Sequence, residues 1–394
     1  MGSTNSALAI KHWHKVRTLL QEQPRSARTD NLRVRAGGQI CVLGWREGLT
    51  LQEVQPFIDE AMELAGEVDG RLIQLLVMAE GRMLQASGGP ADGYVERLQK
   101  AQSLMAPGAD PGRAAMINAA LSQAYAWAGM LGEALEANSS ALRDIGEIDR
   151  FDREWIGFSI EHWVMGMRGR LLTRLGRLDE AEQCLKELLD MGQSSNDPVI
   201  LQFARFGYIE LAWCRHDAAL AEAHYAYVAE IAAKYESPYL RVFALSCRAT
   251  VASIGGDFDT AARTYSEALA LVRSDQVAME FETEILASLA ECYRGLGSFE
   301  QALAAASEAI AISRQRSTRL PECRALITLA SATLDTHGLA RVADAQALFA
   351  EAEALVQLTG ASIYESTLLR ERARLAMLIH QPPENTGVSV GQAA

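Results

Sequence analysis

The sequence predicts an all-α protein, a right-handed superhelix of about eight helix-turn-helix units with a period of about 40 residues. Three observations support this fold class. A turn motif recurs at a near-constant interval, prolines recur at a fixed distance before it, and apolar residues between these marks recur every three and four positions. No stretch alternates like a β-strand. Hydrophobic residues make up 49% of the chain and charged residues 22%, which is sufficient for a large core.

The turn motif marks the units in order along the chain. In its clearest form, a glycine-containing turn is followed five positions later by alanine, as at Gly129, Gly176, Gly256 and Gly297. Weaker copies occur at Gly48, Gly89, His216 and Gly338. With one exception, successive turns are separated by about 40 residues. Because repeats of a solenoid contact only their neighbours, a change at one turn should be felt locally.

Prolines mark where the first helix of several units begins. Pro111, Pro198, Pro238 and Pro321 each precede a turn position by about 18 residues. Proline suits the first helical position because its missing N–H has no intrahelical partner there. Each unit is therefore expected to hold a helix of about 17 residues, a turn and a second helix of similar length. Residues 362–379 should form part of a closing helical cap.

One interval is longer than the others. The interval of about 47 residues between Gly129 and Gly176 implies an insertion of about seven residues, beside Phe151, Trp155 and Phe158. Insertions in repeat proteins often form loops on a binding face. A longer helix or a bulged connector is an equal alternative.

The pattern resembles the tetratricopeptide repeat. That family has a small residue seven positions before the turn residue and alanines five and twelve after it. Matching residues are Gly169, Ala249 and Ala290 before the turns, and Ala261 with Ala268 and Ala302 with Ala309 after them. The family period is about 34 residues, so these helices should be longer by most of a turn each.

The chain also resembles a particular group of repeat regions. Residues 43–50 and 345–361 are similar to the first and last repeats in large bacterial signalling proteins that join a class III adenylate/guanylate cyclase-like domain to an AAA or STAND ATPase. Similar repeats form the inducer-sensing region of large ATP-dependent LuxR-type transcription activators. The resemblance implies a regulatory domain in either setting.

The expected domain organisation is simple. Residues 1–10 are interpreted as a flexible cloning scar, residues 11–380 as a single tetratricopeptide-like solenoid and residues 381–394 as a disordered tail.

No apolar run reaches the roughly 18 residues that span a bilayer, and no secretory signal is visible. Six cysteines without a CxxC pair indicate reduced thiols. We therefore expect a cytoplasmic protein with no membrane contact.

Motifs for catalysis or cofactor binding are not found. The net charge of −13 disfavours nucleic acid as a partner, because phosphate repulsion opposes binding. None of the five lysines follows a glycine as a P-loop requires, and no histidine pair has the spacing of a helical metal site. No Gly-x-Ser-x-Gly elbow is present. The sequence thus predicts no enzyme, no metal and no cofactor.

Aromatic residues are concentrated in one window. Thirteen of the 26 lie between positions 151 and 243. Within it, Trp163, Phe203 and Phe243 share one repeat register, with a spacing of about 40 residues. They are either an aromatic ladder in the groove or core between repeats. The groove positions implied by the tetratricopeptide resemblance add Trp127, Arg170, Arg174, Phe206, Glu210 and Trp213.

These features favour a non-catalytic recognition module of a bacterial signalling protein. It would bind a protein or peptide partner in its concave groove and regulate attached catalytic domains of the parent protein. The first alternative is a small-molecule, or inducer, sensor with the aromatic window as its pocket. The second is an oligomerisation scaffold such as a homodimer.

Overall fold

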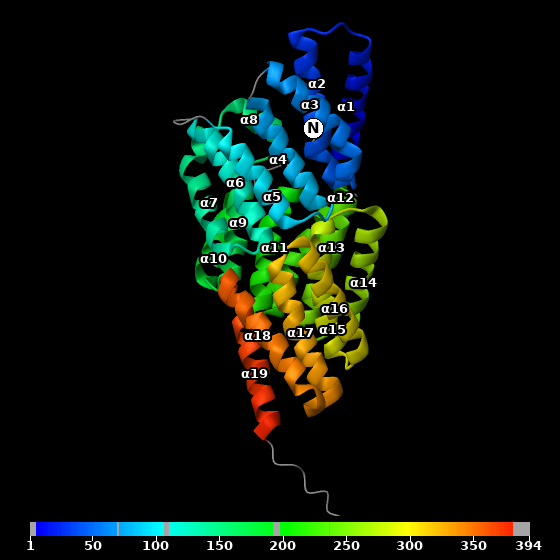
Figure 1. The fold of residues 1–394 in the computed structure, drawn as a ribbon, viewed down its shortest axis with the longest axis vertical. Coiled ribbons are helices and arrows are strands. Elements are labelled where there is room, and N and C mark those ends of the chain that lie inside the picture. Colours follow the sequence, from blue (N-terminus) through cyan, green and yellow to red (C-terminus); the bar gives the residue numbers. More distant parts are fainter. Residues whose placement is uncertain (1–4, 69–70, 106–109, 192–197, 236, 381–394) are drawn as a thin grey trace, which may run out of the picture.

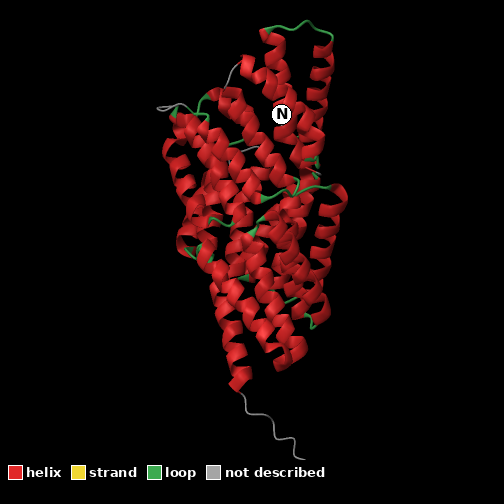
Figure 2. Ribbon diagram, in the orientation of Figure 1, coloured by secondary structure: helices red, strands yellow, loops and turns green. Residues whose placement is uncertain are grey.

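The computed structural model describes residues 5–68, 71–105, 110–191, 198–235 and 237–380. Within these ranges every regular element is a helix (Figure 2). Residues 1–4 and the expected tail at 381–394 lie outside them. The boundary expected at residue 10 is wrong, because helix α1 (Ser6–Gln21) already begins at Ser6. The side chain of Asn5 caps this helix by accepting a hydrogen bond from the Leu8 N–H.

In the described ranges eight helix pairs follow α1, one at each predicted turn, so the expected repeat architecture is confirmed (Figure 1). The pairs are α2 (Ala27–Gly44) with α3 (Leu51–Val68), α4 (Arg71–Ala86) with α5 (Ala91–Ser103), α6 (Pro111–Ala128) with α7 (Leu131–Asp144), α9 (Ile160–Arg174) with α10 (Leu178–Met191), α11 (Pro198–Arg215) with α12 (Ala218–Tyr235), α13 (Pro238–Ile254) with α14 (Phe258–Asp275), α15 (Glu282–Gly295) with α16 (Phe299–Arg316), and α17 (Arg319–His337) with α18 (Val342–Thr359). Helix α8 (Arg150–Ile156) lies between the third and fourth pairs, and α19 (Glu365–His380) follows the last.

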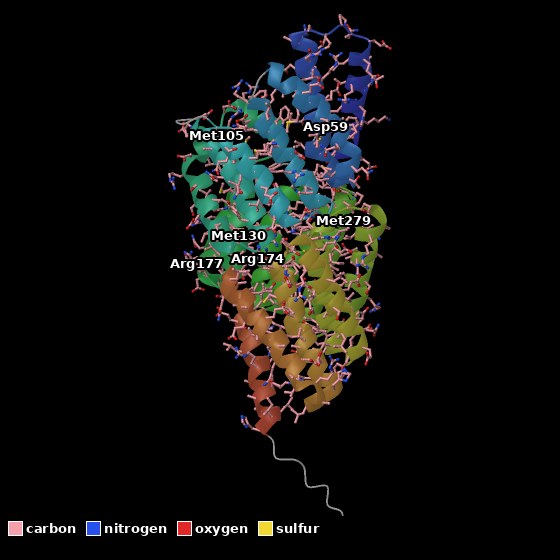
Figure 3. The ribbon with its side chains drawn as sticks, in the orientation of Figure 1. Asp59, Met105, Met130, Arg174, Arg177 and Met279 are labelled. Carbon is pink, nitrogen blue, oxygen red and sulfur yellow. The ribbon has the colours of Figure 1, made fainter. Side chains whose placement is uncertain are left out.

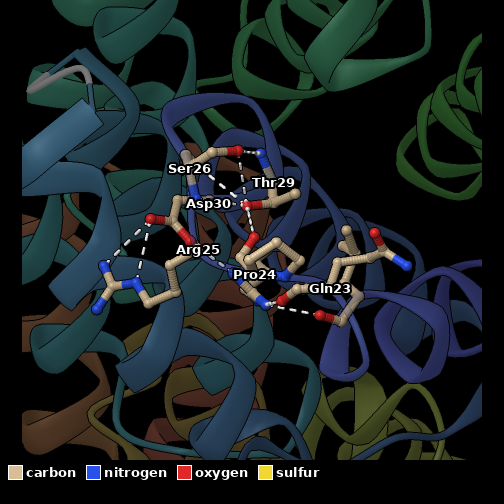
Figure 4. A network of polar contacts seen from close by, with 8 residues as sticks. Gln23, Pro24, Arg25, Ser26, Thr29 and Asp30 are labelled. Atoms are coloured by element: carbon tan, nitrogen blue, oxygen red, sulfur yellow. Dashed lines mark hydrogen bonds and ion pairs between the residues drawn. The ribbon is translucent and has the colours of Figure 1, made fainter.

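Local sequence explains where helices begin. Pro111, Pro198 and Pro238 are the first residues of α6, α11 and α13, as expected, whereas α17 begins two positions before Pro321. Helix α2 starts with a capping box, in which Ser26 and Thr29 each accept the other's backbone N–H through their side chains (Figure 4). Further polar contacts of Asp30 hold this helix start in place.

The turns adopt the left-handed backbone conformation that favours glycine. Gly176 has φ +74° and Gly297 has φ +72°. In each turn the residue after the glycine donates its N–H to the carbonyl oxygen five positions before itself, at 2.9 Å in both cases. In the second pair the left-handed residue is Gly88 rather than the expected Gly89, and in the fifth it is His216, with φ +52°.

The superhelix closes on itself, because turns of its first half pack against its second half. A Cβ atom on Gly48 would lie 2.6 Å from the carbonyl oxygen of Asp275, and one on Gly176 would lie 3.0 Å from the Cβ of Ser362. Arg319 donates a 2.6 Å hydrogen bond to the carbonyl oxygen of Ala128. In Figure 1 the N-terminal helices accordingly lie against those of the C-terminal half. The expectation that repeats contact only their neighbours is therefore wrong.

The buried core follows this closure. One large cluster of buried apolar side chains joins Ile40, Cys41 and Trp45 from the first unit to residues of α11 through α19. The other covers α2 through α9 and takes in Leu320 and Ala361 from the far end of the chain. Each cluster thus contains segments that are distant in sequence.

Substituting the turn glycines tests both the register and the closure. Gly297→Val and Gly176→Val should each lower the free energy of unfolding by roughly 1–3 kcal/mol, because valine is strained at positive φ. Gly176→Val should also speed hydrogen exchange around Ser362, which it contacts across the closure. Gly132→Ala in α7 is the control, since nothing lies within 4 Å of that position, and it should be neutral or stabilising. Unchanged melting of both valine variants would contradict the repeat register.

Candidate functional site

Closure of the superhelix leaves a partly open cavity of about 160 Å³ between its two halves, here called the central cavity. Its walls come from both halves of the chain. The first half supplies α2, the 3-10 turn Trp45–Glu47, α4, α5, α6, α8 and α9, and the second half supplies α11, α13 and the 3-10 turn Met279–Phe281 with α15. Nine aromatic rings line it: Trp45, Tyr94, Trp127, Trp155, Phe158, Trp163, Phe203, Tyr239 and Phe281. Figure 3 shows Arg174, another wall residue, midway along the molecule.

A second, smaller cavity of about 60 Å³ adjoins the first. Phe281 and Glu284 line both cavities and form the boundary between them. Its other walls include Trp213, Tyr364 and Arg324, with the Arg324 guanidinium 4.7 Å from the centre of the Trp213 ring. This cavity extends the interior space towards the C-terminal helices.

The structure distributes the residues selected from the sequence between these two cavities and the core. Trp127, Trp163, Arg170, Arg174 and Phe203 line the central cavity, while Phe206, Glu210 and Trp213 line the second. Phe243 lines neither.

The expected register of Trp163, Phe203 and Phe243 does not form one ladder. Phe243 is 4% exposed, and its ring centre lies 4.5 Å from that of Phe206 and 5.8 Å from that of Phe281. It is a core residue, as the second interpretation of the register required. Trp163 and Phe203 stand at the cavity wall instead. The three residues therefore occupy equivalent positions in successive units but do not form one continuous surface. The reason is that the side chains of neighbouring units pack against different residues in the closed superhelix.

A cluster of three charged side chains lies at the wall between α9 and α11. Arg170 and Arg174 donate through Nε to the two carboxylate oxygens of Glu210, at 2.8 and 2.7 Å. Burial alone would raise the pKa of Glu210, but the two guanidinium groups outweigh it and lower the pKa to about 2. Arg170 also lies 4.4 Å from the centre of the Phe206 ring. The Glu210 carboxylate is therefore ionised at neutral pH.

A second ion pair joins the two halves of the chain across the central cavity. Arg82 on α4 donates to Glu280 at 2.7 Å, and its guanidinium stacks 4.0 Å from the centre of the Trp45 ring. The Trp45 ring in turn lies 4.8 Å from that of Tyr239. Sequence reasoning did not select these four residues. They do not occupy the repeat position shared by Trp163, Phe203 and Phe243, and only the closure of the superhelix brings them together.

The insertion between the third and fourth units is the short helix α8, which closes one side of the cavity. Trp155 is 2% exposed, and its carbonyl oxygen accepts a 2.7 Å hydrogen bond from Gln39. Asp152 pairs with Arg113 at 3.0 Å in the interior. Ile156 and Phe158 complete this wall. The insertion is thus neither a longer helix nor a simple bulge.

The described residues lack the features of several other kinds of site. No three histidine, cysteine, aspartate or glutamate side chains there converge as metal ligands would. None of the helices in these ranges has the length and apolar character needed to cross a membrane. The six cysteines are unpaired thiols.

The comparisons with known proteins agree with the helical-repeat fold. The tetratricopeptide repeat family model matches residues 164–191, which lie in α9 and α10. A search of curated proteins gives no match. Among solved structures, a Rap protein complexed with Competence and Sporulation Factor is 12% identical and has a TM-score of 0.59, with 90% of this chain and 100% of that chain covered.

Two further structures are similar over long stretches with lower scores. A tetratricopeptide repeat protein from Parabacteroides merdae is 18% identical, with 73% of this chain and 98% of that chain covered and a TM-score of 0.39. A STAND signal-transduction ATPase with a tetratricopeptide repeat sensor, from Pyrococcus horikoshii, is 14% identical, with 96% and 54% covered and a TM-score of 0.39. The TM-scores of these two structures are too low for either to add support for the fold beyond that given by the Rap protein. The family match is thus limited to the α9–α10 pair, and the likeness to the Rap protein shows the all-helical repeat fold.

Proposed function

We propose that this chain is a non-catalytic recognition module that binds a compact ligand in its central cavity. The observation that carries the proposal is that both halves of the superhelix supply the cavity walls. A ligand there contacts α4 and α6 on one side and the turn before α15 on the other, so its binding free energy depends on how the halves pack. Binding would therefore bias the shape of the whole superhelix.

The composition of the walls supports binding over catalysis. Aromatic rings supply a large apolar contact area, and a few charged groups among them can fix the orientation of a ligand. Trp127, Trp163, Arg170, Arg174 and Phe203 are the proposed contact residues from the sequence analysis. Glu210 holds both arginines in place. In the signalling setting that the sequence resembles, the module would act in the cytoplasm on attached ATPase or cyclase-like domains.

A protein or peptide partner is the second candidate. One observation favours it: the Rap protein of similar fold is complexed with Competence and Sporulation Factor. The central cavity lies between the two halves of the chain, so a partner that used it would have to insert a short segment. The volume of about 160 Å³ favours a compact ligand.

Tryptophan fluorescence gives a direct test. Four of the six tryptophans line the central cavity, so the neutral apolar probe N-phenyl-1-naphthylamine should quench their emission saturably. Ala126 lies in the wall, and Ala126→Leu should weaken probe binding by about tenfold by filling the space. The matched control is Ala226→Leu, at an exposed position of α12, which should leave binding unchanged. Quenching that is absent, or that Ala126→Leu does not alter, would rule out the cavity as the binding site.

A further inference from the structure

The walls of the central cavity hold buried polar atoms that have no hydrogen-bond partner within the described residues. These atoms are Nη1 of Arg82, Nε1 of Trp127, Nε1 of Trp155 and Oε2 of Glu280. More than nine-tenths of buried polar groups in proteins are satisfied, because an unpaired one costs free energy. Three of the four are donors, and they come from three different helices.

Three of these atoms belong to a set of wall residues that ring contacts, an ion pair and electrostatic interactions link together, Arg82, Tyr94, Trp127, Tyr239 and Glu280, here called the polar corner. The ring of Tyr94 lies 6.5 Å from that of Trp127. Arg82 pairs with Glu280 and lies within electrostatic range of both tyrosines. Burial raises the pKa of Tyr94 and of Tyr239, so both phenols keep their protons at neutral pH. The unpartnered atoms of the polar corner are two donors, Nη1 of Arg82 and Nε1 of Trp127, and one acceptor, Oε2 of Glu280.

Within the polar corner the charges are already balanced, because Arg82 pairs with Glu280. Elsewhere in the walls Arg170 and Arg174 share the carboxylate of Glu210, and Arg46 lies over the Trp45 ring. A net charge placed at the polar corner itself would be buried beside an ion pair that is already complete, which is costly. The donors instead suit an uncharged oxygen acceptor.

We propose that the central cavity binds a neutral compound with a ring-sized apolar body and a carbonyl oxygen that accepts hydrogen bonds at the polar corner. This inference rests on the proposed function. The apolar body lies among the rings of Trp163, Phe203 and Phe158. The carbonyl oxygen accepts from Arg82 and Trp127, whose free donors it satisfies. A ketone, ester, lactone or amide carries this acceptor.

Three naphthalene probes separate the contributions of shape, acceptor and charge. 2-Acetylnaphthalene carries a ketone, 2-isopropenylnaphthalene has the same shape with a CH₂ group in place of the oxygen, and 2-naphthoate carries a negative charge. Binding to the full chain is measured by titration calorimetry and by quenching of tryptophan emission. The ketone should bind about fivefold to tenfold more tightly than the alkene, as expected for one or two added hydrogen bonds, and more tightly than the acid.

Trp127→Phe identifies the donor. The substitution removes the indole N–H and keeps an aromatic ring, so the affinity for the ketone should fall to that for the alkene, while the affinity for the alkene changes little. The matched control is Trp213→Phe in the second cavity, which should preserve the preference for the ketone. The melting temperature of each variant is recorded, so that a folding defect is recognised separately.

The outcomes distinguish the inference from the function on which it rests. Equal binding of ketone and alkene to the unsubstituted chain overturns the carbonyl proposal and leaves the cavity as a binding site. Tighter binding of 2-naphthoate than of the ketone overturns it in favour of an anion site. A ketone preference that survives Trp127→Phe overturns the assignment of the polar corner. If no probe binds, the proposed function fails together with the inference.

Discussion

Replacing Glu210 by glutamine should lower the free energy of unfolding at pH 7 by about 3 kcal/mol. The carboxylate accepts hydrogen bonds from Arg170 and Arg174 in the interior. Glutamine occupies the same space but carries no charge, so two buried guanidinium groups lose their counter-charge. Urea unfolding of the variant and the unsubstituted chain at pH 7 measures the difference.

The same pair of proteins should show a specific pH dependence. The pKa of Glu210 in the folded protein, about 2, lies below its value of roughly 4.3 in an unfolded chain. A lowered pKa contributes stability that is present above the unfolded pKa and is lost as the pH falls through the folded pKa. The difference between the two proteins should therefore shrink as the pH falls from about 4.5 towards 2.

Glu180→Gln is the matched control. Glu180 also pairs with an arginine, Arg177, at 2.6 Å, but both side chains are exposed. Solvent screens this pair, so its loss should leave stability nearly unchanged. Equal effects of the two substitutions on stability would contradict the burial of the Arg170–Glu210–Arg174 cluster.

Truncating Phe243 to alanine should lower the free energy of unfolding by about 3–5 kcal/mol. The ring is 4% exposed and packs against Phe206 and Phe281, so its removal leaves a cavity that the neighbours cannot fill. Phe203→Ala, one repeat earlier in the same register, should cost less than half as much, because Phe203 already borders open space. Thermal and urea unfolding of the two variants give the comparison.

The two phenylalanine variants should also differ in ligand binding. Phe203→Ala should weaken the binding of N-phenyl-1-naphthylamine, because the ring lies in the wall of the central cavity. A stable Phe243→Ala variant, or equal losses at both positions, would contradict the different roles assigned to the two residues.

Much of the fold could be predicted from the sequence, because its signals are local. The clearest turns are specified by a glycine, which tolerates positive φ, and by an alanine that fits between helices five positions later, as at Gly297 and Ala302. Prolines fix several helix starts for an equally local reason, the absence of an N–H. The one misplaced turn, at Gly88, lies beside a second glycine that local sequence cannot distinguish from it.

Fewer residues of the candidate site could be predicted from local sequence. The repeat register led to Trp163 and Phe203, which line the central cavity, because helices of successive units present equivalent positions to the interior. It also led to Phe243, whose surroundings depend on Phe281 in another unit. Arg82 and Glu280 are 198 residues apart and became neighbours only through closure.

The sequence by itself thus determined the helix pairs, their number and their turns, because each depends on contacts within about 40 residues. Only the tertiary structure decided that the superhelix closes, that α8 seals one side and that an aromatic cavity with unpartnered donors lies between the halves. The physical reason is that small rotations between successive units accumulate along a solenoid. Their sum places Gly48 against Asp275 and Gly176 against Ser362, and no single unit encodes it.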